Sequence, residues 1–166
     1  MAKVIPFGEP ENELEREAID LLRYRLPNDD YILFTNLEIR QGLEIFEVDL
    51  ILLTPHGIHV IDVKGTRGRI EIIDPKWYPD NRQPFPSPVR KLRHHAKTLK
   101  ALICDTNRAM NDLNKIYVQA TVLVMHDVLV ADQSNTREGD FVTYLDERGL
   151  TYLQDQAVIP DRALKN

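Results

Sequence analysis

Three residues that could hold a divalent cation and act beside it lie in one short stretch: Asp49, Asp62 and Lys64. Two apolar runs flank the segment Thr54–Gly57, which contains the proline and glycine typical of a chain reversal. If the two central residues of this segment form the loop of a β-hairpin, antiparallel partners have numbers that sum to 111, and Asp49 faces Asp62. Lys64 follows Asp62 by two residues and therefore shares its face of the strand.

An opposed pair of carboxylates works against the fold unless something neutralises it. Directly opposed side chains in an antiparallel pair have Cβ atoms about 4.5 to 5.5 Å apart. Two carboxylates at that distance repel by roughly 1 to 3 kcal/mol at effective dielectric constants of about 80 to 20. A bound divalent cation would reverse the sign of this interaction, and Lys64 adds a fixed positive charge. The pair therefore predicts a cation site.

The alternative is a surface hairpin whose carboxylates are simply solvated. Against it, both faces of the two strands are apolar, with Val48, Leu50, Leu52, Ile61 and Val63 on one face and Ile51, Leu53, Ile58 and Val60 on the other. This pattern indicates strands that are covered on both sides. Because acids at the end of a buried strand are costly unless they are paired or coordinated, we favour a functional site.

The elements that would position these residues follow from periodicity and turn signals. We expect helices at residues 11–25, from Pro88 onward and at 146–157, and strands at 31–39, 46–53, 58–64, 69–73, 116–125, 128–131 and 141–144. Ser87 is a cap for the helix that Pro88 opens, and residues 105–115 either extend that helix or form a short one of their own. Five prolines between Asp74 and Pro88 predict an irregular loop. Gly149 weakens the last helix.

Composition indicates one ordinary globular domain over residues 1–166, since 43% of the residues are apolar and 28% are charged. Cys104 is the only cysteine, so no intrachain disulfide forms and a cytoplasmic location is expected. No segment has the length and apolarity of a signal peptide or a membrane span. The end shortly after Pro160 would suit the N-terminal fragment of a longer, multidomain protein.

The order and spacing of these motifs resemble NERD, the nuclease-related domain of the PD-(D/E)xK nuclease-like superfamily. The matching features are a glutamate-bearing first helix ending at Leu26-Pro27, Val48-Asp49, Thr54–Ile58, Asp62–Gly65, Gly68–Ile70, Trp77, and Ser87-Pro88 opening a helix with His95. They extend over about residues 9–104. The resemblance implies a restriction-endonuclease-like α/β fold, in which a central mixed β-sheet is flanked by helices.

Two features depart from the family pattern. The family often has Glu-x-Lys where this chain has Asp62-Val63-Lys64, a change that keeps a carboxylate but shortens it. The family also tends to have Asn-Pro and then a glutamine in the basic helix, where this chain has Ser87-Pro88 and Lys91. The second change puts a helper role of the glutamine in doubt and leaves the metal site untouched.

The resemblance also implies roles for four residues. Asp49 and Asp62 would hold Mg²⁺, with Mn²⁺ as a substitute, because hard cations prefer oxygen ligands. Lys64 would orient or help to deprotonate the attacking water and offset charge on the phosphate. Among the glutamates of the first helix we choose Glu15 as a further catalytic carboxylate, because it borders the buried stripe of that helix. The alternative for any one of these glutamates is plain solvation.

A basic helix supports a nucleic-acid substrate. No Asp or Glu occurs between Asn81 and Cys104, whereas ordinary solvated helices mix both signs of charge. A structural role is the alternative for the histidine of this helix, as a solvated face is for its lysines and arginines. The residues expected to bind nucleic acid are Arg67, Arg90, Lys91, Arg93, His95 and Lys97.

The main functional hypothesis is a metal-dependent nuclease that hydrolyses phosphodiester bonds of DNA, in a defence system. The alternative is a non-catalytic nucleic-acid-binding or regulatory module fused to a kinase or helicase, since NERD domains occur in such fusions. A protein-interaction domain that uses the proline-rich segment 74–88 has only composition behind it. The sequence does not distinguish DNA from RNA, or endonuclease from exonuclease.

Overall fold

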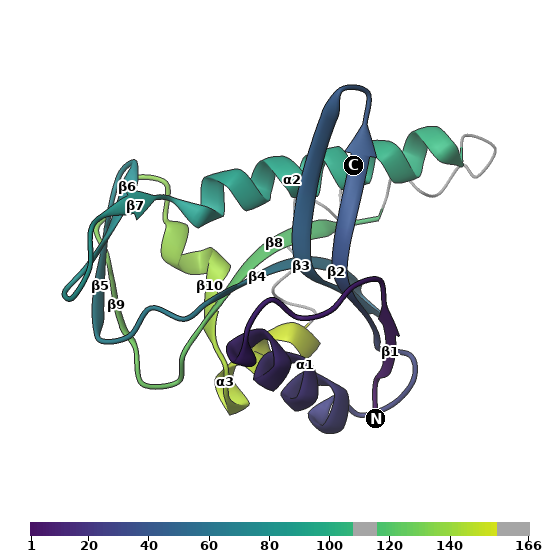
Figure 1. The fold of residues 1–166 in the computed structure, drawn as a ribbon, viewed down its shortest axis with the longest axis horizontal. Coiled ribbons are helices and arrows are strands. Elements are labelled where there is room, and N and C mark those ends of the chain that lie inside the picture. The colour runs from purple at the N-terminus through teal and green to yellow at the C-terminus, as the bar shows by residue number, and fades with distance from the viewer. Residues whose placement is uncertain (108–115, 156–166) are drawn as a thin grey trace.

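The computed structural model describes residues 1–107 and 116–155, and its centre is a six-stranded β-sheet (Figure 1). The strands lie in the order β1 (Lys3–Pro6), β2 (Ile32–Gln41), β3 (Glu44–Thr54), β4 (Gly57–Lys64), β8 (Val118–Val124) and β10 (Val142–Tyr144). Strands β2, β3 and β4 are antiparallel neighbours, whereas β1–β2, β4–β8 and β8–β10 are parallel pairs. The predicted mixed sheet is confirmed.

Helices cover both faces of this sheet. Helix α2 (Pro88–Thr106) packs on one face through Val89, Leu92 and Ala96. Helices α1 (Glu13–Arg25) and α3 (Glu147–Gln154) lie on the other face (Figure 1), and their leucines join a second core with those of β3. This arrangement is consistent with the predicted restriction-endonuclease-like fold. None of the described helices is both long and apolar enough to cross a membrane.

The helix ends follow the expected capping chemistry. The side chains of Asn12 and Ser87 accept hydrogen bonds from the first turns of α1 and α2, and the cap at Ser87 is the predicted one. Helix α1 begins at Glu13, two residues after the predicted start. Helix α2 takes in the start of the undecided segment 105–115 and ends at Thr106, while residues 108–115 lie outside the described part of the chain. The last helix is present as α3, and residues 156–157 of the predicted span also lie outside that part.

Helix α3 needs a glycine at position 149 because the helix passes close to the sheet there. A Cβ atom at this position would lie 1.9 Å from the carbonyl oxygen of Tyr144. Such a distance leaves no room for any side chain. The glycine that weakens the helical prediction is therefore what allows α3 to pack here.

A second, four-stranded sheet lies beside the first (Figure 1), in the order β7 (Phe85–Pro86), β6 (Lys76–Pro79), β5 (Arg69–Ile73) and β9 (Leu129–Asp132). Strands β6 and β7 fall inside the segment that we predicted to be irregular, so that prediction is wrong. Proline is tolerated at a strand end and on an edge strand, and Pro79 and Pro86 occupy such places. The fully buried Trp77 anchors β6 to the core.

The hairpin of β3 and β4 has the predicted register. Thr54 pairs with Gly57 and Leu50 pairs with Ile61, so the partners sum to 111. The loop is held by Thr54, whose hydroxyl oxygen accepts the backbone N–H groups of His56 and Gly57, both at 3.1 Å. Asp49 and Asp62 are therefore the next residues along the two strands.

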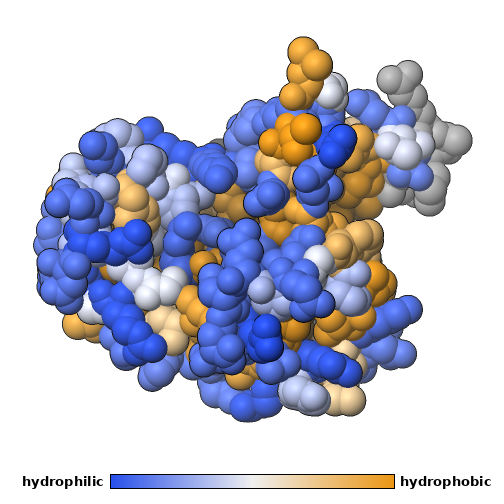
Figure 2. Space-filling view, in the orientation of Figure 1, coloured by the Kyte–Doolittle hydropathy of each residue, from blue (hydrophilic) through white to orange (hydrophobic). Residues whose placement is uncertain are grey.

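The hairpin of β2 and β3 projects from the sheet past α2 (Figure 1). Its tip carries Leu43, which is fully exposed, and Ile45, which is 56% exposed. Figure 2 shows that the end of this projection is hydrophobic. The tip itself therefore lies outside the core, whereas Ile39 and Phe46 farther along the hairpin are buried in it, and the active-site candidates lie at the base.

Candidate active site

Strand β3 loses regular pairing with both of its neighbours at Asp49. Its pairing with β4 stops at Leu50 and Ile61, one residue before Asp49 and Asp62. On the other side, its pairing with β2 skips Asn36 and Asp49. Asn36 has φ of 54°, a left-handed conformation that interrupts a regular strand and that asparagine tolerates better than most residues. The β ladder is therefore broken around Asp49 on both sides.

This break changes which way the preceding residues point. Val48 packs in the core under α2, whereas Leu50 and Leu52 pack in the core under α1 and α3. We predicted all three on one face from strict two-residue alternation, and for Val48 that is wrong. The alternation fails because the strand bends at the interruption. Beyond the pair of Leu50 with Ile61, β3 and β4 are no longer paired, and the two aspartates line a cavity there.

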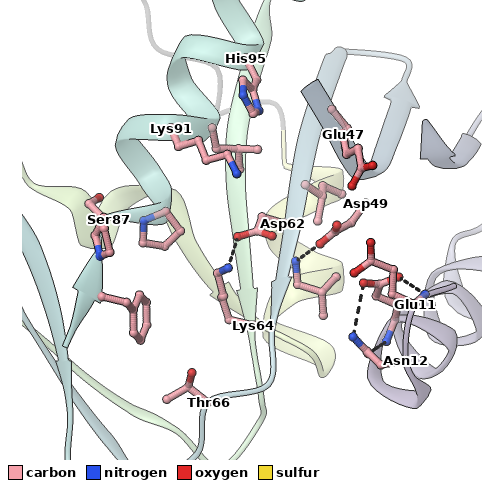
Figure 3. Close-up of a pocket in the computed structure, with 18 of the residues that line it drawn as sticks. Glu11, Asn12, Glu47, Asp49, Asp62, Lys64, Thr66, Ser87, Lys91 and His95 are labelled. Carbon is pink, nitrogen blue, oxygen red and sulfur yellow. Dashed lines mark hydrogen bonds and ion pairs between the residues drawn. The ribbon is translucent and has the colours of Figure 1, made fainter. Parts of the chain in front are cut away.

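The carboxyl groups of Asp49 and Asp62 meet in this space (Figure 3). One oxygen of Asp49, Oδ2, accepts a hydrogen bond of 3.0 Å from the backbone N–H of Val63. The Oδ2 atom of Asp62 lies 3.1 Å from the Nζ atom of Lys64. Asp62 is close enough for its negative charge to act on the carboxyl group of Asp49. The structure thus brings the three residues together.

The environment raises the pKa of Asp49 to about 7. Burial is the largest cause, and the negative charges of Asp62 and Glu15 add to it. The hydrogen bond from Val63 acts in the opposite direction. At neutral pH a proton or a cation at this point relieves the repulsion between the carboxylates.

Glu15 reaches the same cavity from the first turn of α1. Its side chain is only 4% exposed and accepts three hydrogen bonds. The donors are the backbone N–H of Glu11 at 2.9 Å, the Nδ2 atom of Asn36 at 3.1 Å and the Nδ2 atom of Asn12 at 3.5 Å. These donors hold the carboxylate in one orientation. Two of the donor residues also have a backbone role, because Asn12 caps α1 and Asn36 interrupts the β2–β3 ladder.

The cavity has a volume of about 600 Å³ and two chemically different walls (Figure 3). The acidic wall comes from α1 and the residues just before it, from β3 and from β4, and contains Glu11, Glu15, Glu47, Asp49 and Asp62. The basic wall comes from the end of β4, the β6–β7 segment and α2, and contains Lys64, Arg82 and Lys91. A group with negative charge that also interacts with a cation would fit between them.

Of the predicted nucleic-acid-binding residues, the structure brings Lys91 and His95 to this cavity. The His95 ring stacks on Phe46, with ring centres 4.1 Å apart and planes 15° from parallel. Burial lowers the pKa of His95, and the positive charge of Lys91 lowers it further. His95 is therefore a neutral, oriented ring at pH 7, next to a charged lysine.

The structure places the other four away from the cavity lining. Arg67 contacts Asp127 at 3.4 Å, and Arg90 binds Asp74 at 2.9 Å. The guanidinium carbon of Arg93 lies 4.9 Å from the centre of the Phe141 ring. Lys97 is exposed farther along α2. Their predicted role would require contacts with a strand of nucleic acid beyond the cavity.

Sequence reasoning missed several residues that form the site. The interruption at Asn36 could have been predicted from the residue type, because asparagine is unfavourable in the middle of a strand and favours the left-handed region. Arg82 lies in the stretch without acidic residues but before the predicted basic helix, so it was not considered. Glu47, Thr66 and Phe85 carry no local pattern, and only the tertiary structure brings them to the cavity.

The donor set of the cavity fits a hard divalent cation in its chemistry. Asp49 and Asp62 supply carboxylate oxygens, and the pKa of Asp49 is raised by burial and by neighbouring negative charge, both of which a bound cation would offset. Within residues 1–107 and 116–155, no three His, Cys, Asp or Glu side chains already converge as a complete ligand set. The two aspartates would therefore hold an ion together with water or phosphate oxygens, as Mg²⁺ commonly allows.

Comparison with known proteins gives one family. The family model described as the nuclease-related domain, NERD, matches residues 10–125. This range includes α1, the strands that carry the aspartates and all of α2. No curated protein and no solved structure gave a significant match.

The raised pKa of Asp49 gives a prediction for the metal-free protein. Folding raises this pKa from 3.8 to about 7, so the contribution of Asp49 to stability is full below pH 4 and is lost as the pH rises through 7. Asp49→Asn keeps an acceptor for the Val63 N–H without the charge. We expect it to stabilise the fold by about 1 to 3 kcal/mol at pH 8 and to give little change at pH 4, measured by urea unfolding with a chelator present.

Asp20→Asn is the matched control, because Asp20 is an exposed aspartate on α1. It should change the free energy of unfolding by the same small amount at both pH values. A stability gain for Asp49→Asn that does not depend on pH would contradict the assignment.

Asn36 gives a second prediction, which separates its backbone from its side chain. Asn36→Gly keeps the left-handed conformation but loses the hydrogen bond to Glu15, whereas Asn36→Val loses both. We expect the valine variant to be less stable than the glycine variant by about 1 to 3 kcal/mol in thermal or urea unfolding. Equal stability of the two variants would mean that the break in the ladder does not depend on this residue.

Proposed function

We propose that this chain, which belongs to the nuclease-related domain (NERD) family, hydrolyses phosphodiester bonds of DNA with the help of a divalent metal ion. The observation that carries the proposal is the meeting of four groups in one cavity: the carboxylates of Asp49, Asp62 and Glu15 and the ammonium of Lys64. They come from α1, β3 and β4, which the fold fixes by packing on both sides of the sheet. Family membership supports a nuclease-related activity and nucleic acid as the partner.

Asp49 and Asp62 are the residues that would hold the ion, and we propose Mg²⁺, with Mn²⁺ as a substitute. Such an ion, when bound, would lower the pKa of a water ligand and neutralise charge on the phosphate. Asp49 must lose its proton for this role, so ion binding competes with protons at this carboxylate and strengthens as the pH rises through about 7.

Lys64 supports the reaction as a fixed positive charge. Its Nζ atom lies 3.1 Å from Asp62 and can donate to a phosphate oxygen or to the attacking water. In the reaction a water oxygen bonds to phosphorus while the bond to the leaving oxygen breaks. Lys64 would orient that water and offset the negative charge that accumulates on the phosphate.

Glu15, Lys91 and His95 complete the surroundings of the phosphate. Glu15 is oriented by three donors and can accept a hydrogen bond from a water molecule in the cavity. Lys91 on the opposite wall can bind a neighbouring phosphate as a point charge. The neutral ring of His95 can exchange a hydrogen bond with substrate without adding charge. Substrate would therefore lie between α1 and α2, across the middle of β3 and the end of β4.

Replacing one of the aspartates tests the proposal. Asp62→Asn removes a charged ligand but keeps the size of the side chain, so we expect DNA cleavage in Mg²⁺ or Mn²⁺ to fall at least about 100-fold while DNA binding is retained. The exposed Asp20→Asn should cleave at the wild-type rate. Wild-type cleavage by Asp62→Asn would remove the proposal. Binding of DNA without cleavage by the wild-type protein would favour a non-catalytic regulatory module.

The basic wall can be tested through the salt dependence of DNA binding. Lys91→Ala should weaken binding to all sequences and lower the slope of log K against log salt by about 0.7 to 0.9, as expected for one lost phosphate contact. Lys3→Ala is the matched control, because Lys3 is an exposed lysine on β1 that does not line the cavity, and it should leave the slope unchanged. An unchanged slope for Lys91→Ala would mean that the cavity wall does not contact the backbone of DNA.

A further inference from the structure

The cavity wall opposite the acidic residues holds an aromatic and a planar cationic side chain that the proposed hydrolysis does not use. Arg82 and Phe85 come from the short segment that links β6 to β7 and from β7 itself. Phe85 is only partly buried and Arg82 is exposed, so both are open to a ligand. Their wall faces the same space as the carboxylates.

These two side chains form a layered platform. The guanidinium carbon of Arg82 lies 5.5 Å from the centre of the Phe85 ring, within the range of a cation–π contact. The Phe85 ring packs on Trp77, with ring centres 6.0 Å apart. Trp77 is fully buried, and its Nε1 atom lies 3.4 Å from a carboxylate oxygen of the buried Glu138. The platform is therefore supported by the core.

The platform lies close to the residues proposed for catalysis. The Nη1 atom of Arg82 is 3.4 Å from the hydroxyl oxygen of Thr66. Thr66 follows Lys64 by two residues, which an extended chain spans in at most about 7 Å. This separation is comparable to the length of one nucleotide. A phosphate beside Lys64 would therefore place the adjacent base within reach of Arg82 and Phe85.

The size and chemistry of the cavity point to an unpaired base as the occupant. A volume of about 600 Å³ is that of a pocket for a small molecule, so the cavity can enclose an unpaired base but not the full width of a duplex. Aromatic rings and guanidinium planes bind bases by stacking, and the exposed face of a base is available only when the base is unpaired or at an end. The platform has this chemistry and lies in a cavity of this size.

We infer that the substrate enters this site as single-stranded DNA, with the base next to the scissile phosphate stacked on Arg82 and Phe85. The inference rests on the proposed function, because it takes the phosphate position from Lys64 and the carboxylates. Stacking tolerates every base, so the site selects strand state and not sequence. A duplex would have to open, or present a frayed end, before cleavage.

Binding to DNA without metal tests the inference independently of cleavage. We would measure fluorescence anisotropy of an oligonucleotide of about ten nucleotides, single-stranded or in a duplex, with the full chain and a chelator. We expect wild type to bind the single strand at least about fivefold more tightly than the duplex. Phe85→Leu should weaken single-strand binding by about 5- to 100-fold and leave duplex binding unchanged, and Phe85→Tyr should restore it.

Two further variants keep the test valid if Phe85→Leu loses its packing on Trp77. Arg82→Lys keeps the charge but removes the planar guanidinium, so it should reduce the preference for the single strand and not the duplex affinity. Tyr78→Leu replaces an aromatic residue of β6 that is 38% exposed and does not line the cavity, and it should bind like wild type.

Equal affinity of wild type for single strand and duplex would overturn the inference. So would a preference for the single strand that survives both Arg82→Lys and Phe85→Leu, or a stronger preference for single-stranded RNA than for DNA. If the preference follows the platform residues but no cleavage occurs in Mg²⁺ or Mn²⁺, the proposed hydrolysis fails and the stacking site stands. If Phe85→Leu cleaves single strand and duplex with unchanged KM and kcat, hydrolysis stands and the stacking site fails.

Discussion

The repulsion between two partly buried carboxylates is the interaction on which the site depends. Asp49 and Asp62 meet where burial raises the pKa of Asp49 to about 7, an arrangement that is unfavourable for the fold in the absence of a proton or a cation. A hydrogen bond from the backbone of Val63 and the ion pair of Lys64 with Asp62 offset part of that cost. Such a cost is typical of a functional site, where charged groups destabilise the ligand-free fold and a bound ligand neutralises them.

The rest of the structure holds this pair in place. The β2–β3 ladder is interrupted at Asp49, opposite the left-handed backbone of Asn36. The same asparagine donates to Glu15, so the residue that bends the strand also orients the third carboxylate. Helices α1 and α2 pack on opposite faces of the sheet and supply the acidic and the basic side of one cavity. Local backbone geometry, core packing and electrostatics thus act on the same few atoms.

The parts of this account that the sequence could predict are those set by local chemistry. Turn residues and the two-residue period of the strands fix the register of β3 and β4, and side-chain caps fix where α1 and α2 begin. The missed features are tertiary. Strand β1 is short and is stabilised by pairing with β2, and the prolines near β6 and β7 are accommodated because they lie at a strand end and an edge. Val48 was misplaced because regular alternation assumes an unbroken ladder. Arg82 and Phe85 line the cavity because the second sheet positions the β6–β7 segment there, and no local sequence pattern predicts that sheet.

The central claim is that the carboxyl groups of Asp49 and Asp62 share one environment, and their titration measures this directly. NMR of carboxyl-labelled aspartate in metal-free protein should show Asp49 titrating near pH 7, and its midpoint should fall in Asp62→Asn because a neighbouring negative charge is gone. Adding Mg²⁺ should lower the midpoint in the wild-type protein. A midpoint near 4 for Asp49, unaffected by either change, would contradict the account.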